Sequence, residues 1–150
     1  MNVKKLLQKI VENQRESHMQ ITLLENTTVS ISATWSYVKV PFNKIRDMTG
    51  LFSNSSISSN SIVIPKDGVY RLSGIGTSRN GTYFRIEVND TFVENSAIQP
   101  STTYASVPVP TIIKKLNSGD KVCMKICKSE SANPTVVGDG STYLLVEKIG

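Results

Sequence analysis

The chain contains only two cysteines and one histidine among its 150 residues. Cys123 and Cys127 lie four positions apart on a predicted strand, and at ~3.3 Å per residue their Cα atoms would be roughly 13 Å apart, too far for a disulfide. A lone Cys-x-x-x-Cys pair is also poor spacing for a zinc site. We therefore expect free thiols and no bound metal, as is typical of proteins that assemble in a reducing cytoplasm.

Recognisable catalytic motifs are also missing. His18, the single histidine, falls at the end of a predicted N-terminal helix, so a Ser-His-Asp triad within the rest of one chain is excluded. The Gly-x-Gly at residues 74–76 lacks the third glycine of a dinucleotide fingerprint, and no Gly-Lys-Ser/Thr phosphate loop is present. Glu87 and Glu94 flank a predicted hairpin, and we interpret them as surface residues instead of a glycosidase pair. We expect no enzymatic activity and no cofactor.

Long apolar runs are absent, since none approaches the ~20 residues of a membrane-spanning helix, and we expect no membrane insertion. Residues 1–11 hold only short apolar pairs, interrupted by Gln8 and Lys9, and predict no secretory signal. The net charge is +5, but the 17 Lys and Arg residues are scattered along the chain. Scattered charge indicates a soluble surface, so we expect no nucleic-acid partner.

The first positive signal is helical periodicity over residues 2–20. Spacings of three and four place one apolar stripe on this helix, formed by Val3, Leu6, Leu7, Ile10 and Val11. So short a helix is marginal alone in water, and the stripe needs a partner. The partner of this stripe is its own domain, copies of the same helix, or a groove on another protein. We assign residues 1–25 as a docking or trimerisation segment.

From Ile21 onward the apolar period changes to two, and the composition is rich in Ser, Thr and Asn. Short alternating strands separated by turn signals predict an all-β sandwich or jelly roll. Alternation directs one set of side chains to the core, namely Tyr70, Leu72, Phe84, Ile86, Val88, Val122, Met124 and Ile126.

The last predicted strand is apolar on both faces over Tyr143, Leu144, Leu145 and Val146. A strand buried on both sides at this position indicates contact with another subunit. These four residues are therefore candidates for a subunit interface.

Trp35 and Tyr37 form a second candidate site. Apolar faces of sugars pack on aromatic rings, so the pair is a candidate platform for stacking a glycan. Aromatic residues of this kind also serve as core or interface anchors, and both interpretations stay open at this point.

Four short motifs follow one another between residues 50 and 122. In the second, Pro65 closes a strand because it lacks an amide hydrogen, and Gly68 is expected to take the positive φ of a tight turn. The motifs are Gly50-Leu51-Phe52, Ile64-Pro65-x-x-Gly68-x-Tyr70, Glu87-Val88-Asn89-Asp90 and Leu116-x-x-Gly119-Asp120-x-Val122. With them, residues 33–150 resemble the C1q/TNF-like jelly-roll family. The resemblance implies an all-β, ten-strand jelly-roll sandwich that trimerises about its inner sheets and acts as a binding module.

The chain departs from that family in two places. Residues 1–32 contain no collagen-like Gly-x-y repeat, and the closing strand has Tyr143-Leu144-Leu145 where the family has an aromatic-Ser-Gly step. A short helix followed directly by a C1q-like head is similar to small bacteriophage virion proteins, whose N-terminus docks on the particle while the head faces outward.

That similarity implies a homotrimeric structural protein of the virion, such as a head fibre, decoration or tail-tip protein, assembled in the host cytoplasm. Its expected partners are capsid, portal or tail proteins, together with a glycan or protein of the host-cell surface. A soluble receptor- or glycan-binding module without a particle is the alternative, because a fold alone does not fix function.

Overall fold

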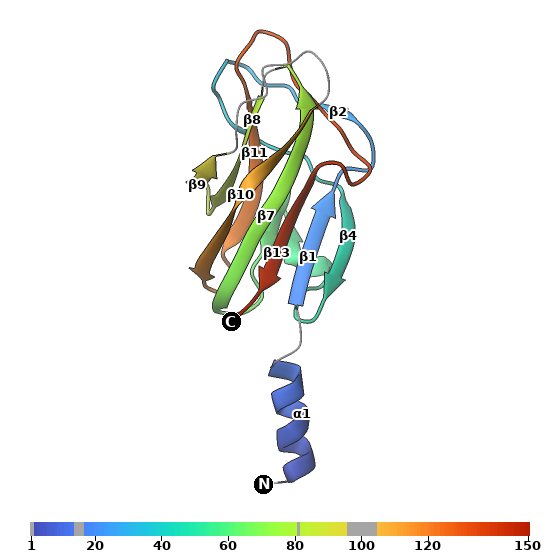
Figure 1. Ribbon diagram of the computed structural model, residues 1–150, viewed down its shortest axis with the longest axis vertical. Helices are drawn as coiled ribbons and strands as arrows, with labels where there is room; N and C mark the ends of the chain where they lie inside the picture. Colours follow the sequence, from blue (N-terminus) through green and yellow to red (C-terminus); the bar gives the residue numbers. More distant parts are fainter. Residues whose placement is uncertain (1, 14–16, 81, 96–104) are drawn as a thin grey trace.

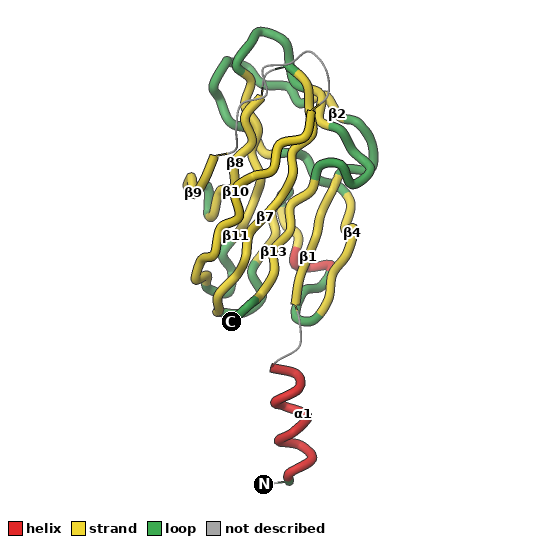
Figure 2. Tube along the Cα trace, in the orientation of Figure 1, coloured by secondary structure: helices red, strands yellow, loops and turns green. Residues whose placement is uncertain are grey.

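A computed structural model describes residues 2–13, 17–80, 82–95 and 105–150 of the chain. Two antiparallel sheets pack face to face, and one helix, α1 (Val3–Asn13), extends from one end of the sandwich (Figure 1). Apart from α1 and a short 3-10 turn at Asn54–Ser56, the regular structure is strand (Figure 2). The predicted jelly-roll class with a short N-terminal helix is confirmed.

The first sheet, sheet A, has the order β2 (Thr27–Thr28), β12 (Thr135–Val136), β7 (Gly68–Arg79), β13 (Tyr143–Lys148), β1 (Ser17–Thr22), β4 (Lys44–Thr49), and β10 (Ala105–Leu116) pairs with β7. The second, sheet B, has the order β5 (Ile57–Ser58), β6 (Ser61–Val63), β11 (Lys121–Lys128), β8 (Thr82–Val88), β9 (Thr91–Asn95), and β3 (Val38–Lys39) pairs with β11. Strands distant in sequence are therefore neighbours, as the pairing of β13 with both β1 and β7 shows.

The core lies between the two sheets and contains every residue that alternation assigned to it. Tyr70 and Leu72 come from sheet A, and Phe84, Met124 and Ile126 from sheet B, all fully buried. The remaining assigned residues, Ile86, Val88 and Val122, are buried beside them. The period-two prediction of the core face is thus confirmed.

Glycines on β7 shape this core. A side chain at Gly76 would meet the ring of Phe84, and one at Gly74 would meet Met124. The Gly-x-Gly at residues 74–76 therefore lets the backbone of sheet A approach two large side chains of sheet B. Its role is in packing.

The N-terminal helix is shorter than its sequence pattern predicts. The helix ends at Asn13, and Ser17–Thr22 forms β1, which lies between β13 and β4 inside sheet A. The prediction of a helix over residues 2–20, within a segment 1–25, is wrong from Ser17 onward. Met19 and Ile21 alternate and are fully buried in the core. As a strand, this segment forms backbone hydrogen bonds with both β13 and β4. A helix continued here would have had only a fading apolar stripe with which to pack.

Helix α1 stands apart from the sandwich (Figure 1). Its apolar side chains Val3, Leu6 and Leu7 are 69%, 42% and 57% exposed. The side chains of Ile10 and Val11, which complete the predicted stripe, lie outside the described residues. The described part of the stripe is not buried against its own head.

Two of the motif turns meet at the end of the sandwich nearest α1. The Ser118 N–H donates to Asp67 Oδ1 at 2.7 Å, and Tyr70 Oη donates to the Lys66 carbonyl at 2.7 Å. Gly68 lies outside the positive-φ residues, so its expected left-handed conformation is wrong. A Cβ there would instead meet the Gly150 carbonyl and the Lys148 side chain, so Gly68 is needed for close approach of the chain end.

Candidate functional site

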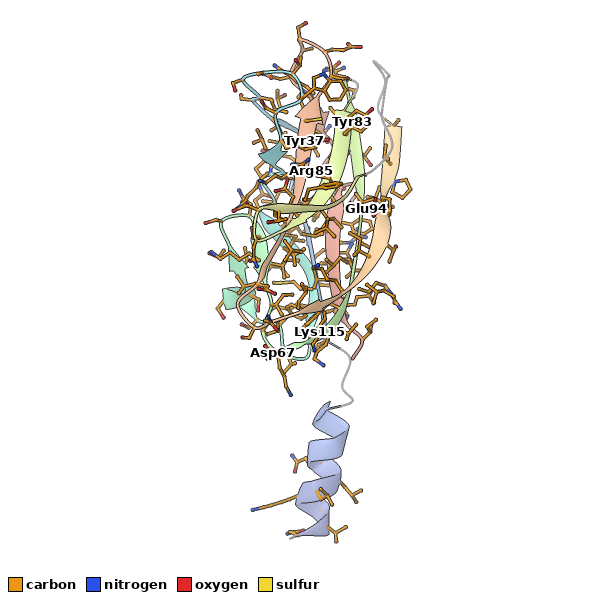
Figure 3. The ribbon with its side chains drawn as sticks, turned by 90° about the vertical axis from the view of Figure 1, so that its left-hand side faces the viewer. Tyr37, Asp67, Tyr83, Arg85, Glu94 and Lys115 are labelled. Atoms are coloured by element: carbon orange, nitrogen blue, oxygen red, sulfur yellow. The ribbon has the colours of Figure 1, made fainter. Side chains whose placement is uncertain are left out.

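Aromatic and charged side chains gather on the outer face of sheet B. On β8, Phe84 and Ile86 point to the core, so Tyr83, Arg85 and Glu87 point outward. The segment before β3 adds Trp35 and Tyr37, and β9 adds Phe92. We call this set of aromatic residues with Arg85 the aromatic band; Figure 3 shows Tyr37, Tyr83 and Arg85 together in the half of the head distant from α1.

Trp35 is held at the exposed end of the band. Its φ of 65° is a left-handed conformation that is unusual for a bulky residue. Its N–H donates to the Lys128 carbonyl at 2.8 Å, and its ring lies 5.4 Å from that of Tyr83 at 44°. With 54% of the residue still exposed, Trp35 presents an indole surface to solvent that the core does not use.

Arg85 joins the rest of the band. Its guanidinium carbon lies 3.6 Å from the centre of the Tyr37 ring and 5.2 Å from that of Phe92. Stacking of a guanidinium on aromatic faces is favourable and keeps its planar group fixed. The arginine therefore positions two rings that come from different segments of the chain.

Glu87 forms an ion pair with Arg85 and holds it in place. The Glu87 side chain is 1% exposed, accepts from Arg85 Nε at 2.7 Å and lies 2.9 Å from Lys125 Nζ. Lys125 also reaches Asp90 at 3.4 Å. Burial on its own lowers the pKa of Lys125, but the hydrogen bond and charge of Glu87 outweigh it and the net pKa is raised. Glu87 is buried and paired with two cations, so its interpretation as a surface residue is wrong.

Tyr37 of the band and the nearby Cys123 are held in their neutral forms. Burial raises the pKa of Tyr37 to about 12, helped by a hydrogen bond with Cys127. Burial likewise raises the pKa of Cys123 to about 11. Both cysteines are free thiols, as the sequence predicts. A thiol with so high a pKa is a poor nucleophile at neutral pH.

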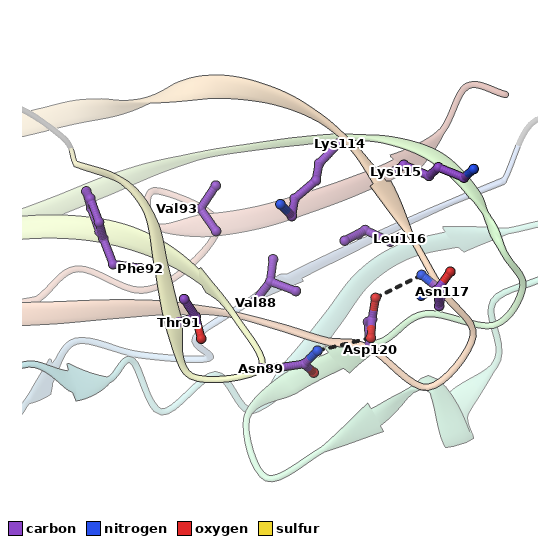
Figure 4. Close-up of a pocket in the computed structure, with 10 residues that line it drawn as sticks. All are labelled: Val88, Asn89, Thr91, Phe92, Val93, Lys114, Lys115, Leu116, Asn117 and Asp120. Atoms are coloured by element: carbon purple, nitrogen blue, oxygen red, sulfur yellow. Dashed lines mark hydrogen bonds between the residues drawn. The ribbon is translucent and has the colours of Figure 1, made fainter.

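A depression of about 510 Å³ lies next to the band, between β9 and the end of β10 (Figure 4). Val88, Val93 and Leu116 form its apolar part, and Phe92 belongs to both the band and the depression. Across the Asn89–Asp90 turn is a smaller depression of about 300 Å³ with Lys39 and Lys121 on its walls. In the larger depression a small ligand group fits beside the exposed ring of Phe92.

The predicted interface residues divide between two faces of β13. Leu144 and Val146 are fully buried in the core of their own chain, so they have no surface to offer a second copy. Tyr143 and Leu145 are half-buried and point outward from sheet A. Tyr143 lies in one row with Ile75 on β7 and Pro108 on β10. We call this surface the outer face of sheet A.

His18 also lies on that face, because it belongs to β1 and not to a helix. Its Nε2 is 2.7 Å from Asp47 Oδ2, and its Nδ1 is 3.1 Å from the Thr49 hydroxyl. The argument that excluded a histidine from the β-domain is therefore wrong. Asp47 is 59% exposed, so its pair with His18 lies in water and is weak.

Sequence reasoning found two members of the aromatic band, Trp35 and Tyr37, and missed Tyr83, Arg85 and Phe92. A signal for the first two was present, since Tyr83 and Arg85 occupy the outward positions of a strand whose core face was assigned correctly. The stacking of Arg85 on Tyr37 joins segments about fifty residues apart in the chain, which the sequence pattern does not reveal.

Within the described residues, no group of three or more His, Cys, Asp and Glu side chains is placed to hold a metal ion. The same part of the chain includes no helix with the length and apolarity needed to cross a membrane.

Solved structures of several animal proteins have the same arrangement of sheets. The globular domain of zebrafish complement 1qA aligns with a TM-score of 0.61 at 12% identity, over 89% of this chain and 95% of that domain. Murine APRIL gives 0.61 at 16% identity over 90% of this chain and 100% of its own. The fold is the C1q/TNF-like jelly roll.

Eiger TNF from S. frugiperda has the same fold, with a TM-score of 0.59 at 10% identity, covering 90% of this chain and 92% of its own. No protein-family model matches the sequence, and no curated protein matches it either. At such identities the shared property is the C1q/TNF-like fold itself, and function has to be argued from the surfaces of this chain.

Proposed function

We propose that this protein is a non-enzymatic, homotrimeric structural protein of a bacteriophage particle. In this proposal α1 attaches the protein to a capsid, portal or tail protein, and the C1q/TNF-like head faces outward and binds the host surface through the aromatic band. The observation that carries the proposal is the separation of a helix with an exposed apolar side from a complete, well-packed head.

Trimerisation uses the outer face of sheet A. Tyr143 and Leu145 leave apolar surface on this face, and Ile113 at its β10 edge is 62% exposed. A stable interface buries roughly 800 Å² on each partner and places apolar and aromatic groups at its centre. The half-buried Tyr143 and Ile75, with the exposed Pro108 beside them, supply such a centre, and the charged pairs around it form a polar rim.

Particle attachment uses α1. An isolated helix of 11 residues is marginal in water, and the apolar side chains Val3, Leu6 and Leu7 are exposed. Binding of an amphipathic helix in a groove of a larger assembly would stabilise it. The docking segment is then residues 1–13, and the head begins at Ser17, since β1 belongs to sheet A.

Incorporation into particles tests this role. Leu6→Asp and Leu7→Asp place charge on the exposed apolar side of α1, and Lys4→Ala on the same helix serves as the matched control. We expect both aspartate variants to fold and trimerise normally but to disappear from purified particles, while the control is retained. Normal incorporation of the aspartate variants would contradict docking through α1.

A soluble glycan- or receptor-binding module without a particle is the second candidate, and the exposed aromatic band favours a binding role in either case. The two candidates differ in genomic context and in particle content. Neighbouring capsid, portal or tail genes and detection of the protein in purified virions support the first. Absence of the protein from every purified particle, together with saturable glycan binding by the free protein, supports the second.

A further inference from the structure

A lysine occupies a core-facing position in β10. Lys114 pairs with Tyr70, and the flanking pairs are Ile112 with Leu72 and Leu116 with Gly68. Paired residues of antiparallel strands point to the same side, and Tyr70, Leu72 and Leu116 are buried between the sheets. Lys114 therefore points to the core side at the open edge of the sandwich. Figure 4 shows its side chain directed into the depression beside Val93 and above Val88.

Lys114 forms no salt bridge with a described residue, although its charge helps to lower the pKa of Asp120 in the same depression. In the described part of the chain, neither Lys114 nor the adjacent Lys115 has a carboxylate within 4 Å. Asp120 is the acidic residue of the depression, and it is already bound: Oδ1 accepts from the Asn89 amide at 3.0 Å and Oδ2 from the Asn117 N–H at 2.8 Å. These neutral donors leave the charge of Asp120 in place, so the depression carries two lysine charges against one carboxylate, above an apolar floor.

The surroundings add to this charge. The smaller depression on the other side of Asn89 contains Lys39 and Lys121, and its acidic residue Asp90 lies 3.4 Å from Lys125. Both depressions therefore carry more cationic than free anionic groups, which favours an anionic ligand.

Aromatic surface continues from the depression to the band. Phe92 lines the depression, is 46% exposed, and lies 5.2 Å from the Arg85 guanidinium. An exposed ring beside an unpaired ammonium suits a ligand that has both an apolar ring face and an acidic group. Acidic sugars combine these features, because a pyranose ring stacks on an aromatic ring while its carboxylate binds a cation.

We propose that the depression between β9 and β10 binds an acidic saccharide, with Lys114 pairing the carboxylate and Phe92 stacking the sugar ring. The inference rests on the proposed host-binding role of the head and names its ligand class. A linear oligosaccharide would continue from Phe92 along Arg85 and Tyr37 toward Trp35. Neutral sugars lack the carboxylate that Lys114 requires, and they bind this site more weakly.

Calorimetric titration of the full chain with oligogalacturonate tetramer tests the proposal, and the fully methyl-esterified tetramer keeps the rings but removes the charge. We expect saturable binding of the acid and at least tenfold weaker binding of the ester. Lys114→Gln should weaken binding of the acid about tenfold, and Phe92→Ala several-fold. Lys44→Gln, an exposed lysine on β4, is the matched control and should bind as the wild type does.

Three results would overturn the proposal: no saturable binding up to millimolar ligand, equal affinity for acid and ester, or equal loss in Lys114→Gln and Lys44→Gln. Competition by a single-stranded oligonucleotide at equal charge would show a general polyanion surface and would also overturn it. Solution mass and particle incorporation are measured on the same variants, so failure of the saccharide site is distinguished from failure of the trimer or of α1 docking.

Discussion

At the residue scale, the contact of Phe84 with Gly76 is the most demanding packing feature of the core. The fully buried Phe84 ring occupies the space that a side chain at position 76 would need. We expect Phe84→Ala to lower the free energy of unfolding by about 3–5 kcal/mol through the cavity it leaves. Gly76→Ala should lower it by about 1–3 kcal/mol through overpacking.

Denaturant unfolding of both variants measures these losses, and Phe92→Ala is the control for removal of an exposed ring. The control should change the free energy of unfolding by less than about 1 kcal/mol. A loss below about 1 kcal/mol for Phe84→Ala would show that the core face of β8 is assigned backwards.

The carboxylate of Asp120 makes the stability of the head depend on pH in the acidic range. The Asn117 N–H, followed by the Asn89 amide, donates to its carboxylate and lowers its pKa below the usual value of about 3.9. Because the folded pKa is the lower one, the stabilisation is fully present above the unfolded pKa and is lost as the pH falls through the folded pKa. The melting curves of the wild type and Asp120→Asn should therefore differ at pH 7, and the difference should shrink as the pH falls below about 4. An unchanged difference at pH 3 would refute this assignment.

Single-residue roles were only partly predictable from the sequence. Alternation placed Phe84 and Met124 in the core, because burial follows strand geometry. The requirement for glycine at position 68 was attributed to the wrong cause. A side chain there would collide with Lys148 and Gly150, which lie at the other end of the chain. Arg85 was missed for the same reason, since Tyr37 reaches it from a distant segment.

At the scale of elements, α1 and β1 adjoin in sequence but belong to different parts of the molecule. Removal of residues 1–13 should leave a folded head whose melting temperature is nearly unchanged, because the described apolar side chains of α1 are exposed. Removal of residues 1–22 should prevent folding, because it deletes β1 from between β13 and β4 and empties the sites of Met19 and Ile21.

Circular dichroism melts of the two truncated chains check this difference. A large loss of stability in the chain without residues 1–13 would place α1 in the head. The boundary itself was mispredicted because Gln14, Ser17 and His18 looked like the polar end of a helix. Ser17 and His18 instead begin an alternating strand, and its two pairing partners lie far along the chain.

At the scale of the whole molecule, the outer face of sheet A is expected to hold three copies together. Leu145→Glu places charge in the middle of this face without touching the core, because Leu145 points away from Leu144 and Val146. We expect this variant to remain folded but to be monomeric. Leu24→Glu changes a leucine that is 59% exposed in a loop, and should stay trimeric. Trimers of Leu145→Glu would exclude this face.

The mass of the wild-type protein in solution tests the central claim most directly. Light scattering or sedimentation equilibrium at micromolar concentration measures it without labels or partners. The account predicts a single species with three times the chain mass of 16.5 kDa, unchanged on dilution through the micromolar range. A stable species of 16.5 kDa under these conditions would contradict a trimeric head.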